Sequence, residues 1–316
     1  MSWSGDLNPC YANRCMTKQG SAVLWMGFSV FTASSLIILF IAHQRRRGHR
    51  TFHYLSAAIL ITASISYFVM ASNLGNTPIE TEFNRASPGE TRSVFYARYV
   101  DWVITTPLLL LTLLLATGLP LSIIFFTLFI DIVMIVCGLI SALIASRYKF
   151  GLFSIGCACL FYIYFILLVV GRRSASALGD GYGTAYYRGA YYLVLVWTIY
   201  PIIWGCSEGG NVISVTSEVI AYLVLDLLAK VVFTALHLYS IERLDYDLLG
   251  LSSGKWTDTT TVVDKNHSTR SQEISLKYLG NKENLPPSSP TAPSHSSAQG
   301  GPQPNQLERK TSGRVA

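Results

Sequence analysis

Four ionisable residues lie inside two long apolar stretches of this sequence, at spacings that place them on shared helix faces. Arg98, Asp101 and Thr105 follow one another at i, i+3 and i+7, which is one face of a helix. Asp226 and Lys230 form an i, i+4 pair in the last apolar stretch. An ionisable side chain at membrane depth costs about 2.5–3.5 kcal/mol on insertion scales. Each of these residues is therefore a candidate for function.

The charges of these residues can compensate one another. If the two helices face each other, Lys230 meets the carboxylates of Asp101 and Asp226, with Arg98 just beyond them. Two cations and two anions make a neutral cluster, which a low-dielectric interior demands. The alternative is a buried ion-pair network that only fixes the register of the helices.

Lys230 is also of the residue type that forms Schiff bases, because burial favours its nucleophilic amine. A protonated imine needs a counterion, and Asp101 and Asp226 are placed to supply it. With Trp102, side chains of the sixth apolar stretch could line a slot for a long, flat polyene. Taken alone, such a stripe is more often helix packing. The residues of the sixth stretch are spaced i, i+3, i+4 and i+7: Trp197, Tyr200, Pro201 and Trp204.

Seven apolar stretches are long enough to position these residues inside a membrane, because a span needs about 20 mostly apolar residues. The chain is 51% hydrophobic and 13% charged, whereas a soluble chain carries about 25% charged residues. The sequence therefore predicts an all-α membrane protein, a bundle of seven transmembrane helices. The expected spans are residues 21–42, 52–74, 94–116, 120–145, 150–171, 189–206 and 216–240.

The arginines between these stretches predict the orientation of the chain. Cytoplasmic connections carry an excess of basic residues, so we expect a multi-pass protein of the plasma membrane, with its N-terminus outside and its C-terminus in the cytoplasm. The net charge of +6 then reflects basic residues in the connections, which set the topology, and gives no reason to expect nucleic acid. The basic residues are Arg45, Arg46, Arg47 and Arg50 in the first connection, and Arg172, Arg173 and Arg188 in the fifth.

Composition divides the chain into three parts. Residues 1–20 are expected to form an extracellular arm, in which Cys10 and Cys15 could pair, and residues 21–245 the helical domain. Residues 246–316 are rich in Ser, Thr, Pro and Gly and predict a disordered cytoplasmic tail, because they cannot bury enough surface to offset the entropy of ordering. No zinc-type cysteine spacing occurs, so no metal is expected. The polar N-terminus argues against a cleavable signal peptide.

The segments RYVDWVITTPLLLL and DLLAK, in the third and last helices, resemble those of the microbial (type 1) rhodopsins, in particular the fungal opsins of the bacteriorhodopsin-like family. The resemblance covers about residues 20–245. It implies a retinal pocket at the centre of the bundle, with all-trans retinal bound covalently to Lys230 as a protonated Schiff base. Asp101 resembles the primary counterion and proton acceptor, and Asp226 the second counterion. Arg98 resembles the arginine that organises the outward half-channel.

The same resemblance assigns further positions. Tyr67 matches a tyrosine that hydrogen-bonds near the second counterion, and Asp131 an aspartate next to the pocket. Glu208 and Glu218 match the paired glutamates of outward proton pumps, where like charges let two carboxylates hold a proton. The alternative for Glu208 is a solvated loop position. The residues at retinal-pocket positions are Trp102, Thr106, Met134, Gly138, Trp197, Tyr200, Pro201 and Trp204, and Phe153 stands where many relatives have a tryptophan.

Thr112 departs from the family pattern. It lies eleven residues inward of Asp101, about 16 Å along a helix, on nearly the same face. Efficient outward pumps of this family carry a carboxylic acid there, which returns a proton to the Schiff base. A threonine can relay a proton but cannot store one, so we expect a slow photocycle.

Three functions remain open on this resemblance. Asp101, Thr105 and Arg98, with the paired glutamates, favour a light-driven outward proton pump, and Thr112 weakens that hypothesis. A photosensory receptor without net transport would benefit from a slow cycle. A non-photoactive relative, such as the chaperone-like opsin-related proteins of fungi, typically lacks the lysine, so Lys230 argues against it. Chloride and sodium pumps are disfavoured by the acids and hydroxyls of the third helix. We predict a proton-translocating photoreceptor and not an enzyme.

The expected partners follow from this prediction. They are membrane lipid and protons. A homo-oligomer and an unidentified cytoplasmic partner of the tail stay open, and nucleic acid is not expected.

Overall fold

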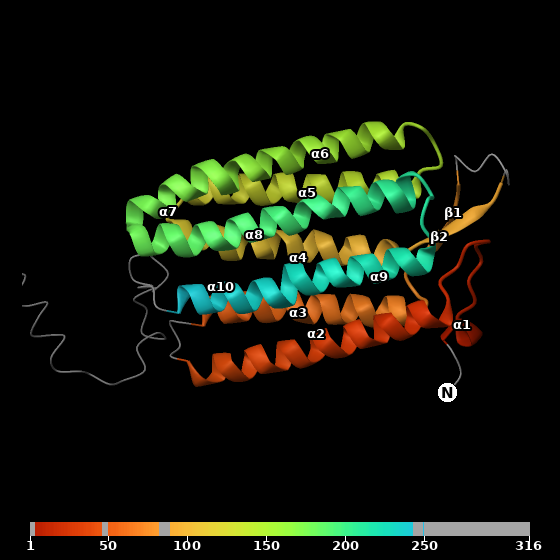
Figure 1. Ribbon diagram of the computed structural model, residues 1–316, viewed down its shortest axis with the longest axis horizontal. Coiled ribbons are helices and arrows are strands. Elements are labelled where there is room, and N and C mark those ends of the chain that lie inside the picture. The colour runs from red at the N-terminus through yellow and green to blue at the C-terminus, as the bar shows by residue number, and fades with distance from the viewer. Residues whose placement is uncertain (1–3, 46–49, 82–88, 243–248, 250–316) are drawn as a thin grey trace, which may run out of the picture. The chain divides into compact units, whose positions relative to one another are not determined.

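Seven helices of the computed structural model are long and apolar enough to cross a membrane, counted over the residues it describes, which are 4–45, 50–81, 89–242 and 249. This confirms the predicted seven-helix bundle, and Figure 1 shows the helices side by side. The expected tail, 246–316, lies outside the described residues except for Leu249. The spans are Lys18–Gln44, Thr51–Ala71, Tyr96–Thr117, Leu121–Leu143, Lys149–Leu178, Asp180–Gly209 and Val215–Ile241.

Several spans combine more than one helical element. The first four spans are α2 (Lys18–Gln44), α3 (Thr51–Ala71), α4 (Tyr96–Leu114, ending in the short 3₁₀ turn Leu115–Thr117) and α5 (Leu121–Leu143). The last three are α6 (Lys149–Phe165) with α7 (Arg172–Leu178), α8 (Asp180–Trp204), and α9 (Val215–Asp226) with α10 (Phe233–Ile241). A short helix, α1 (Ser4–Leu7), precedes them.

The last span is π-helical over Leu227–Val232, the segment that contains Lys230. A π-turn frees a backbone carbonyl, and in a membrane such a group must find another partner. Here the Tyr192 hydroxyl donates to the carbonyl of Leu228 over 3.2 Å. The π-helical stretch Ile166–Gly171, which joins α6 to α7, is compensated in the same way by another tyrosine hydroxyl. The widened turn at Lys230 is therefore stabilised by the hydrogen bond from Tyr192.

The fifth and sixth spans extend much further than the hydropathy pattern predicts. Arg172 and Arg188 were expected in a connection, but both lie in helices that are interrupted only at Gly179, where φ is +138°. Small residues allow the two helices to approach closely, since a Cβ on Gly183 would lie 2.6 Å from the Ser176 hydroxyl. The prediction of the helix ends failed because hydropathy marks only the apolar part of a helix. Packing between the two helices continues through the polar residues beyond it.

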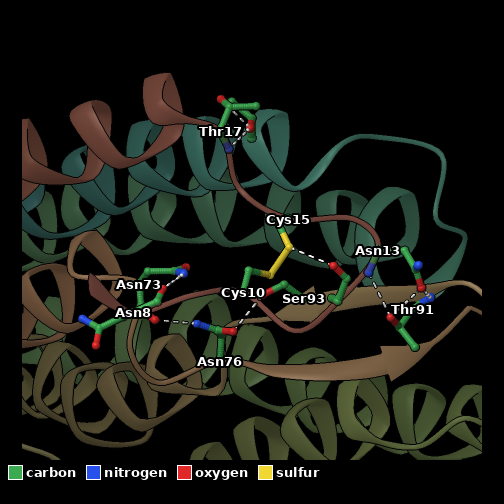
Figure 2. Close-up of a disulfide and its surroundings, with 11 residues drawn as sticks. Asn8, Cys10, Asn13, Cys15, Thr17, Asn73, Asn76, Thr91 and Ser93 are labelled. Atoms are coloured by element: carbon green, nitrogen blue, oxygen red, sulfur yellow. Dashed lines mark hydrogen bonds between the residues drawn. A yellow bond between two sulfur atoms is a disulfide. The ribbon is translucent and has the colours of Figure 1, made fainter. Parts of the chain in front are cut away.

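A β-hairpin and the N-terminal segment lie together at one end of the bundle, which we call the outer end (Figure 1). The hairpin pairs β1 (Thr77–Glu80) with β2 (Thr91–Val94) in antiparallel register. The opposite end, which carries α7, is the inner end. Figure 2 shows that Cys10 and Cys15 form a disulfide beside the hairpin. The Asn13 side chain accepts from the Thr91 backbone amide over 2.9 Å, so the arm is fastened to β2.

Two apolar clusters meet at the last span, and this positions Lys230. Leu227 and Val231 pack with the cluster between α2 and α3, whereas Leu228 and Ala229 belong to the cluster between α4 and α8. The outward faces of the bundle are apolar as well, as a lipid-facing surface requires. Exposed apolar side chains include Leu36, Ile37, Phe40, Phe125, Phe126 and Phe129.

Candidate functional site

Lys230 and two carboxylates form an ion-paired group in the middle of the bundle. Lys230 Nζ donates to Asp101 Oδ2 and lies 3.5 Å from Asp226 Oδ1. All three side chains are at most 1% exposed. The expectation that the third and seventh spans bring these residues together is borne out by this geometry.

The two carboxylates differ in their hydrogen bonds. Asp226 accepts from the hydroxyls of Tyr67 and Tyr200 over 2.8 and 2.7 Å, and from the indole of Trp102 over 3.2 Å. Asp101 has one oxygen, Oδ1, without a hydrogen-bond partner. Three donors therefore hold Asp226 in place and stabilise its charge, while Asp101 keeps an oxygen that can accept a proton.

Thr105 and Thr106 use their hydroxyls in different ways. Thr105 Oγ1 donates to the backbone carbonyl of Asp101 over 2.9 Å, one turn earlier in α4. Thr106 Oγ1 lies 2.7 Å from the carboxylate of Asp131 on α5, which is completely buried. The expectation that Asp131 lies next to the pocket is consistent with this contact.

Arg98 does not join the group around Lys230, so the expected four-charge neutral cluster is wrong. Its guanidinium donates to Glu218 over 2.5 Å and lies 3.6 Å from Glu208. The physical reason is the direction of the side chain. Side chains in a helix tilt toward its N-terminus, and the N-terminus of α4 is at the outer end. Arg98 therefore extends away from Asp101.

The glutamates form a second buried charged group near the outer end. Arg92 of β2 donates to Glu218 over 2.6 Å, opposite the contact that Arg98 makes. Glu208 is 3% exposed, so the alternative of a solvated loop residue is wrong. Its carboxylate accepts from the Tyr99 hydroxyl over 3.1 Å. We call Arg92, Arg98, Glu208 and Glu218 the outer cluster.

Sequence reasoning missed Arg92, because it stands in a polar connection where a solvated arginine is the ordinary expectation. Its guanidinium also donates to the backbone carbonyl of Ile213 over 2.6 Å. The short Thr91–Val94 segment next to the third span shows no alternation of polar and apolar residues that could have revealed the strand. The pairing of β2 with β1 holds the backbone of Arg92, whose side chain then reaches Glu218.

An apolar cavity lined by aromatic and aliphatic side chains adjoins Lys230. Phe153 stacks on Trp204 with ring centroids 4.3 Å apart, and Trp102 meets Tyr200 edge to face at 5.2 Å. Tyr67 does not line the cavity and instead bonds Asp226. The predicted residues that line it are Trp102, Thr106, Met134, Gly138, Phe153, Trp197, Tyr200, Pro201 and Trp204. The cavity is also lined by residues that the sequence did not predict: Tyr99, Leu109, Ile135, Gly156, Cys157, Leu160, Tyr222 and Ala229.

Thr112 lies in α4 toward the inner end and does not reach Lys230. It is 1% exposed, and its hydroxyl donates to the backbone carbonyl of Leu108 over 2.7 Å. This hydrogen bond occupies its only proton. Thr112 therefore stands between the cavity and the inner end without a stored proton to give.

A seven-helix membrane bundle with a buried, ion-paired lysine beside an aromatic cavity has the architecture of the retinal proteins. The chain matches the family model of the bacteriorhodopsin-like proteins over residues 19–244. Protein FDD123 of Trametes versicolor is 47% identical over 259 residues, which are 82% of this chain and 90% of that protein. Opsin-like protein carO of Fusarium fujikuroi is 44% identical over 239 residues, 75% of this chain and 78% of that protein.

A solved structure extends this similarity to the fold. The light-driven proton pump Coccomyxa subellipsoidea rhodopsin CsR has a TM-score of 0.69 and 35% identity, with 72% of this chain and 99% of that chain covered. The chain belongs to the bacteriorhodopsin-like family of microbial rhodopsins. It is a multi-pass membrane protein and a retinal photoreceptor, and not an enzyme. Membership of this family implies retinal bound to a lysine.

The cavity fits retinal. Its walls are apolar and aromatic, and the buried amine of Lys230 faces it beside Asp226. These features suit a flat polyene that ends in an aldehyde carbon.

We predict that Glu218→Gln lowers the free energy of unfolding by about 3–5 kcal/mol, because it leaves two buried guanidiniums with one carboxylate. Chemical denaturation in detergent, followed by circular dichroism, measures the change. Glu90→Gln is the matched control. Its ion pair with Arg14 is partly exposed, so it should cost under about 1 kcal/mol. An equally small loss for both variants would contradict the structural importance of the outer cluster.

Proposed function

We propose that the protein binds all-trans retinal covalently through Lys230 and moves protons outward across the membrane when illuminated. The observation that carries this proposal is the contact of Lys230 Nζ with a carboxylate, Asp101, that keeps a free oxygen. Retinal, when bound, supplies the absorption of visible light and a light-driven change of shape beside Lys230. The side chain of Asp101 then accepts the proton that leaves Nζ.

Asp226 serves as the fixed second counterion. Its three donors, from Tyr67, Tyr200 and Trp102, compensate its charge without a proton. Because these donors also orient it, Asp226 stays in place while the proton moves to Asp101. The difference in hydrogen bonding thus supports one acceptor and one permanent anion.

The outer cluster supports an outward exit for the proton. Arg98 belongs to the same helix as Asp101, one turn closer to the outer end, and it contacts both glutamates. When Asp101 becomes neutral, the guanidinium of Arg98 is held less strongly from its inner side. Glu208 and Glu218 can share a proton, because two carboxylates in one site repel each other when both are charged. A stronger pull from Arg98 would release that proton to the outside.

The residues that line the cavity would hold the polyene. Trp102 and Tyr200 meet edge to face near Asp226, whereas Phe153 and Trp204 stack further along the cavity. Close aromatic walls restrict the shapes that a bound polyene can take. We therefore assign the predicted lining residues to retinal binding, together with Tyr67 as the residue that orients Asp226.

The orientation is proposed with the outer end outside the cell and the inner end in the cytoplasm of a plasma-membrane protein. The Cys10–Cys15 disulfide supports it, since disulfides persist in oxidising compartments. Arg45 and Arg50 at the inner end agree with the excess of basic residues on the cytoplasmic side. The proposed parts are an outer arm, 1–20, a rhodopsin domain, 21–245, and a cytoplasmic tail, 246–316.

We predict that illuminated cells that express the protein with retinal acidify the medium, and that a protonophore abolishes the signal. External pH recorded with an electrode measures it, with cells that carry the Lys230→Ala variant as the control. Absence of a protonophore-sensitive signal, in protein that absorbs visible light, would contradict transport. It would leave a photosensory receptor, the function that Thr112 favours.

We predict that Thr112→Asp accelerates the return of the proton to Lys230 about 100-fold, because a carboxylic acid stores the proton that a threonine lacks. Flash photolysis in detergent measures the rate through the recovery of the visible absorption. The control is Thr112→Asn, because asparagine has nearly the same shape as aspartate but carries no acidic proton. If the aspartate variant is no faster than the parent, the assignment of a slow photocycle to Thr112 is wrong.

A further inference from the structure

The inner half of the bundle holds no buried carboxylate among the residues that the structure describes. Asp131 lies beside the cavity, bonded to the Thr106 hydroxyl. The acidic residues described further inward are Asp180, exposed at the start of α8, and Glu242, which is half exposed. A proton that returns to Lys230 from the inner end must therefore use another group.

His237 of α10 is a buried titratable side chain in this inner half. It is 3% exposed and lies seven residues, or two turns, after Lys230 on the same face. Its ring stacks on Phe233 and meets the edge of Phe52, with centroids 5.6 and 5.7 Å apart. Neither ring nitrogen has a hydrogen-bond partner among the described residues, and the backbone of Thr112 lies near the ring. A buried polar group without a firm partner requires an explanation.

A hydroxyl without a hydrogen-bond partner lies between Lys230 and His237. Thr234 is one turn after Lys230 and three residues before His237, so the three residues share one face. Its side chain is buried, and Oγ1 has no partner within the described part of the chain. A path of polar atoms therefore runs along the last span toward the inner end.

The same depth holds a second such hydroxyl, on α3. Ser56 lies eleven residues inward of Tyr67, and His237 lies eleven residues inward of Asp226, to which Tyr67 donates. At 1.5 Å per residue, both lie about 16 Å inward of that contact, and Thr112 has the same depth by the same count. Ser56 Oγ is buried without a partner. Polar atoms of this kind are the usual partners of buried water.

The surroundings of His237 favour a neutral ring. An imidazolium at this depth would be a buried cation, and no described carboxylate stands near it. The neighbouring helices present Phe52 from α3, the backbone of Thr112 from α4, and Gly189 from α8, where a Cβ would lie 3.8 Å from Nδ1. A neutral imidazole has one nitrogen that donates and one that accepts, which is what a relay needs and a proton store does not.

We propose that His237 relays the proton that returns to Lys230 from the inner end, in place of the carboxylic acid that is absent at Thr112. The inference rests on the proposed transport function. One ring nitrogen accepts a proton from the inner side, and the other releases its proton toward Thr234 and Lys230. The ring gains one proton and loses one, so it ends neutral as the other tautomer. A turn of the ring restores the first.

The test is flash photolysis of retinal-bound His237→Phe, in which the new ring can stack between Phe233 and Phe52. We expect the return of the proton to Lys230 to slow by a factor on the order of 100. His53→Phe, which changes another buried histidine of the inner half, should keep the rate of the parent. The relay would be overturned if the proton returned to Lys230 in His237→Phe as fast as in the parent. It would also be overturned if only His53→Phe slowed that return.

A second variant separates chemistry from damage to the fold. Thr112→Asp added to His237→Phe should restore a fast return, because a stored proton replaces the relayed one. If the double variant stays slow although it binds retinal, the loss is structural and the proposal is wrong. A parent that never transfers a proton from Lys230 would contradict the proposed transport itself. If the parent pumps protons and His237→Phe returns the proton equally fast, only the relay is contradicted.

The resting state gives a measurement that does not depend on transport. Solid-state NMR of the dark, retinal-bound protein with ¹⁵N-labelled histidine identifies the ring of His237 by its loss in His237→Phe. We expect one protonated and one unprotonated ring nitrogen. Two protonated nitrogens would mean a stored proton and would overturn the neutral relay.

Discussion

The ion pair between Lys230 and Asp101 sets the conditions for the rest of the structure. A lysine ammonium in the interior of a membrane bundle has no water to solvate it, so carboxylates must lie within contact distance. Asp101 and Asp226 supply them from two different helices, which fixes how α4 and the last span face each other. Two carboxylates against one ammonium leave an excess of negative charge. Hydrogen bonds from Tyr67, Tyr200 and Trp102 to Asp226 offset it.

The same constraint acts a second time in the outer cluster, with different residues. Two glutamates and two arginines are buried there, and one of the arginines, Arg92, comes from a β-strand and not from a helix. The hairpin is therefore part of the charged site and not a simple connection. One turn of α4, from Arg98 to Asp101, connects the two charged groups. In the proposed mechanism, a change of charge at Asp101 alters the electrostatic attraction on Arg98. Among the described residues, the buried carboxylates lie beside the cavity or nearer the outer end and none lies in the inner half, and this asymmetry supports the proposed outward direction.

Much of this arrangement could be predicted from the sequence, and the failures have physical causes. Hydropathy locates the seven spans, because only helices satisfy their backbone within lipid. Helical spacing correctly brings Lys230 to Asp101, yet it misplaced Arg98, since spacing specifies a face but not the direction of a long side chain. Burial of Arg92 depends on strand pairing across a polar connection. The pattern of polar and apolar residues in the sequence does not predict that pairing. His237 was not predicted as a functional residue, because a single histidine in an apolar segment forms no motif or spacing that would distinguish it.

We propose that the amine of Lys230 holds the chromophore within this compensated group of charges. The most direct measurement is the visible absorption of purified, retinal-reconstituted protein, compared between the parent and Lys230→Ala. We predict a visible band in the parent and none in the variant, where added retinal keeps the spectrum of the free aldehyde. A Lys230→Ala protein that retained the visible band would contradict it.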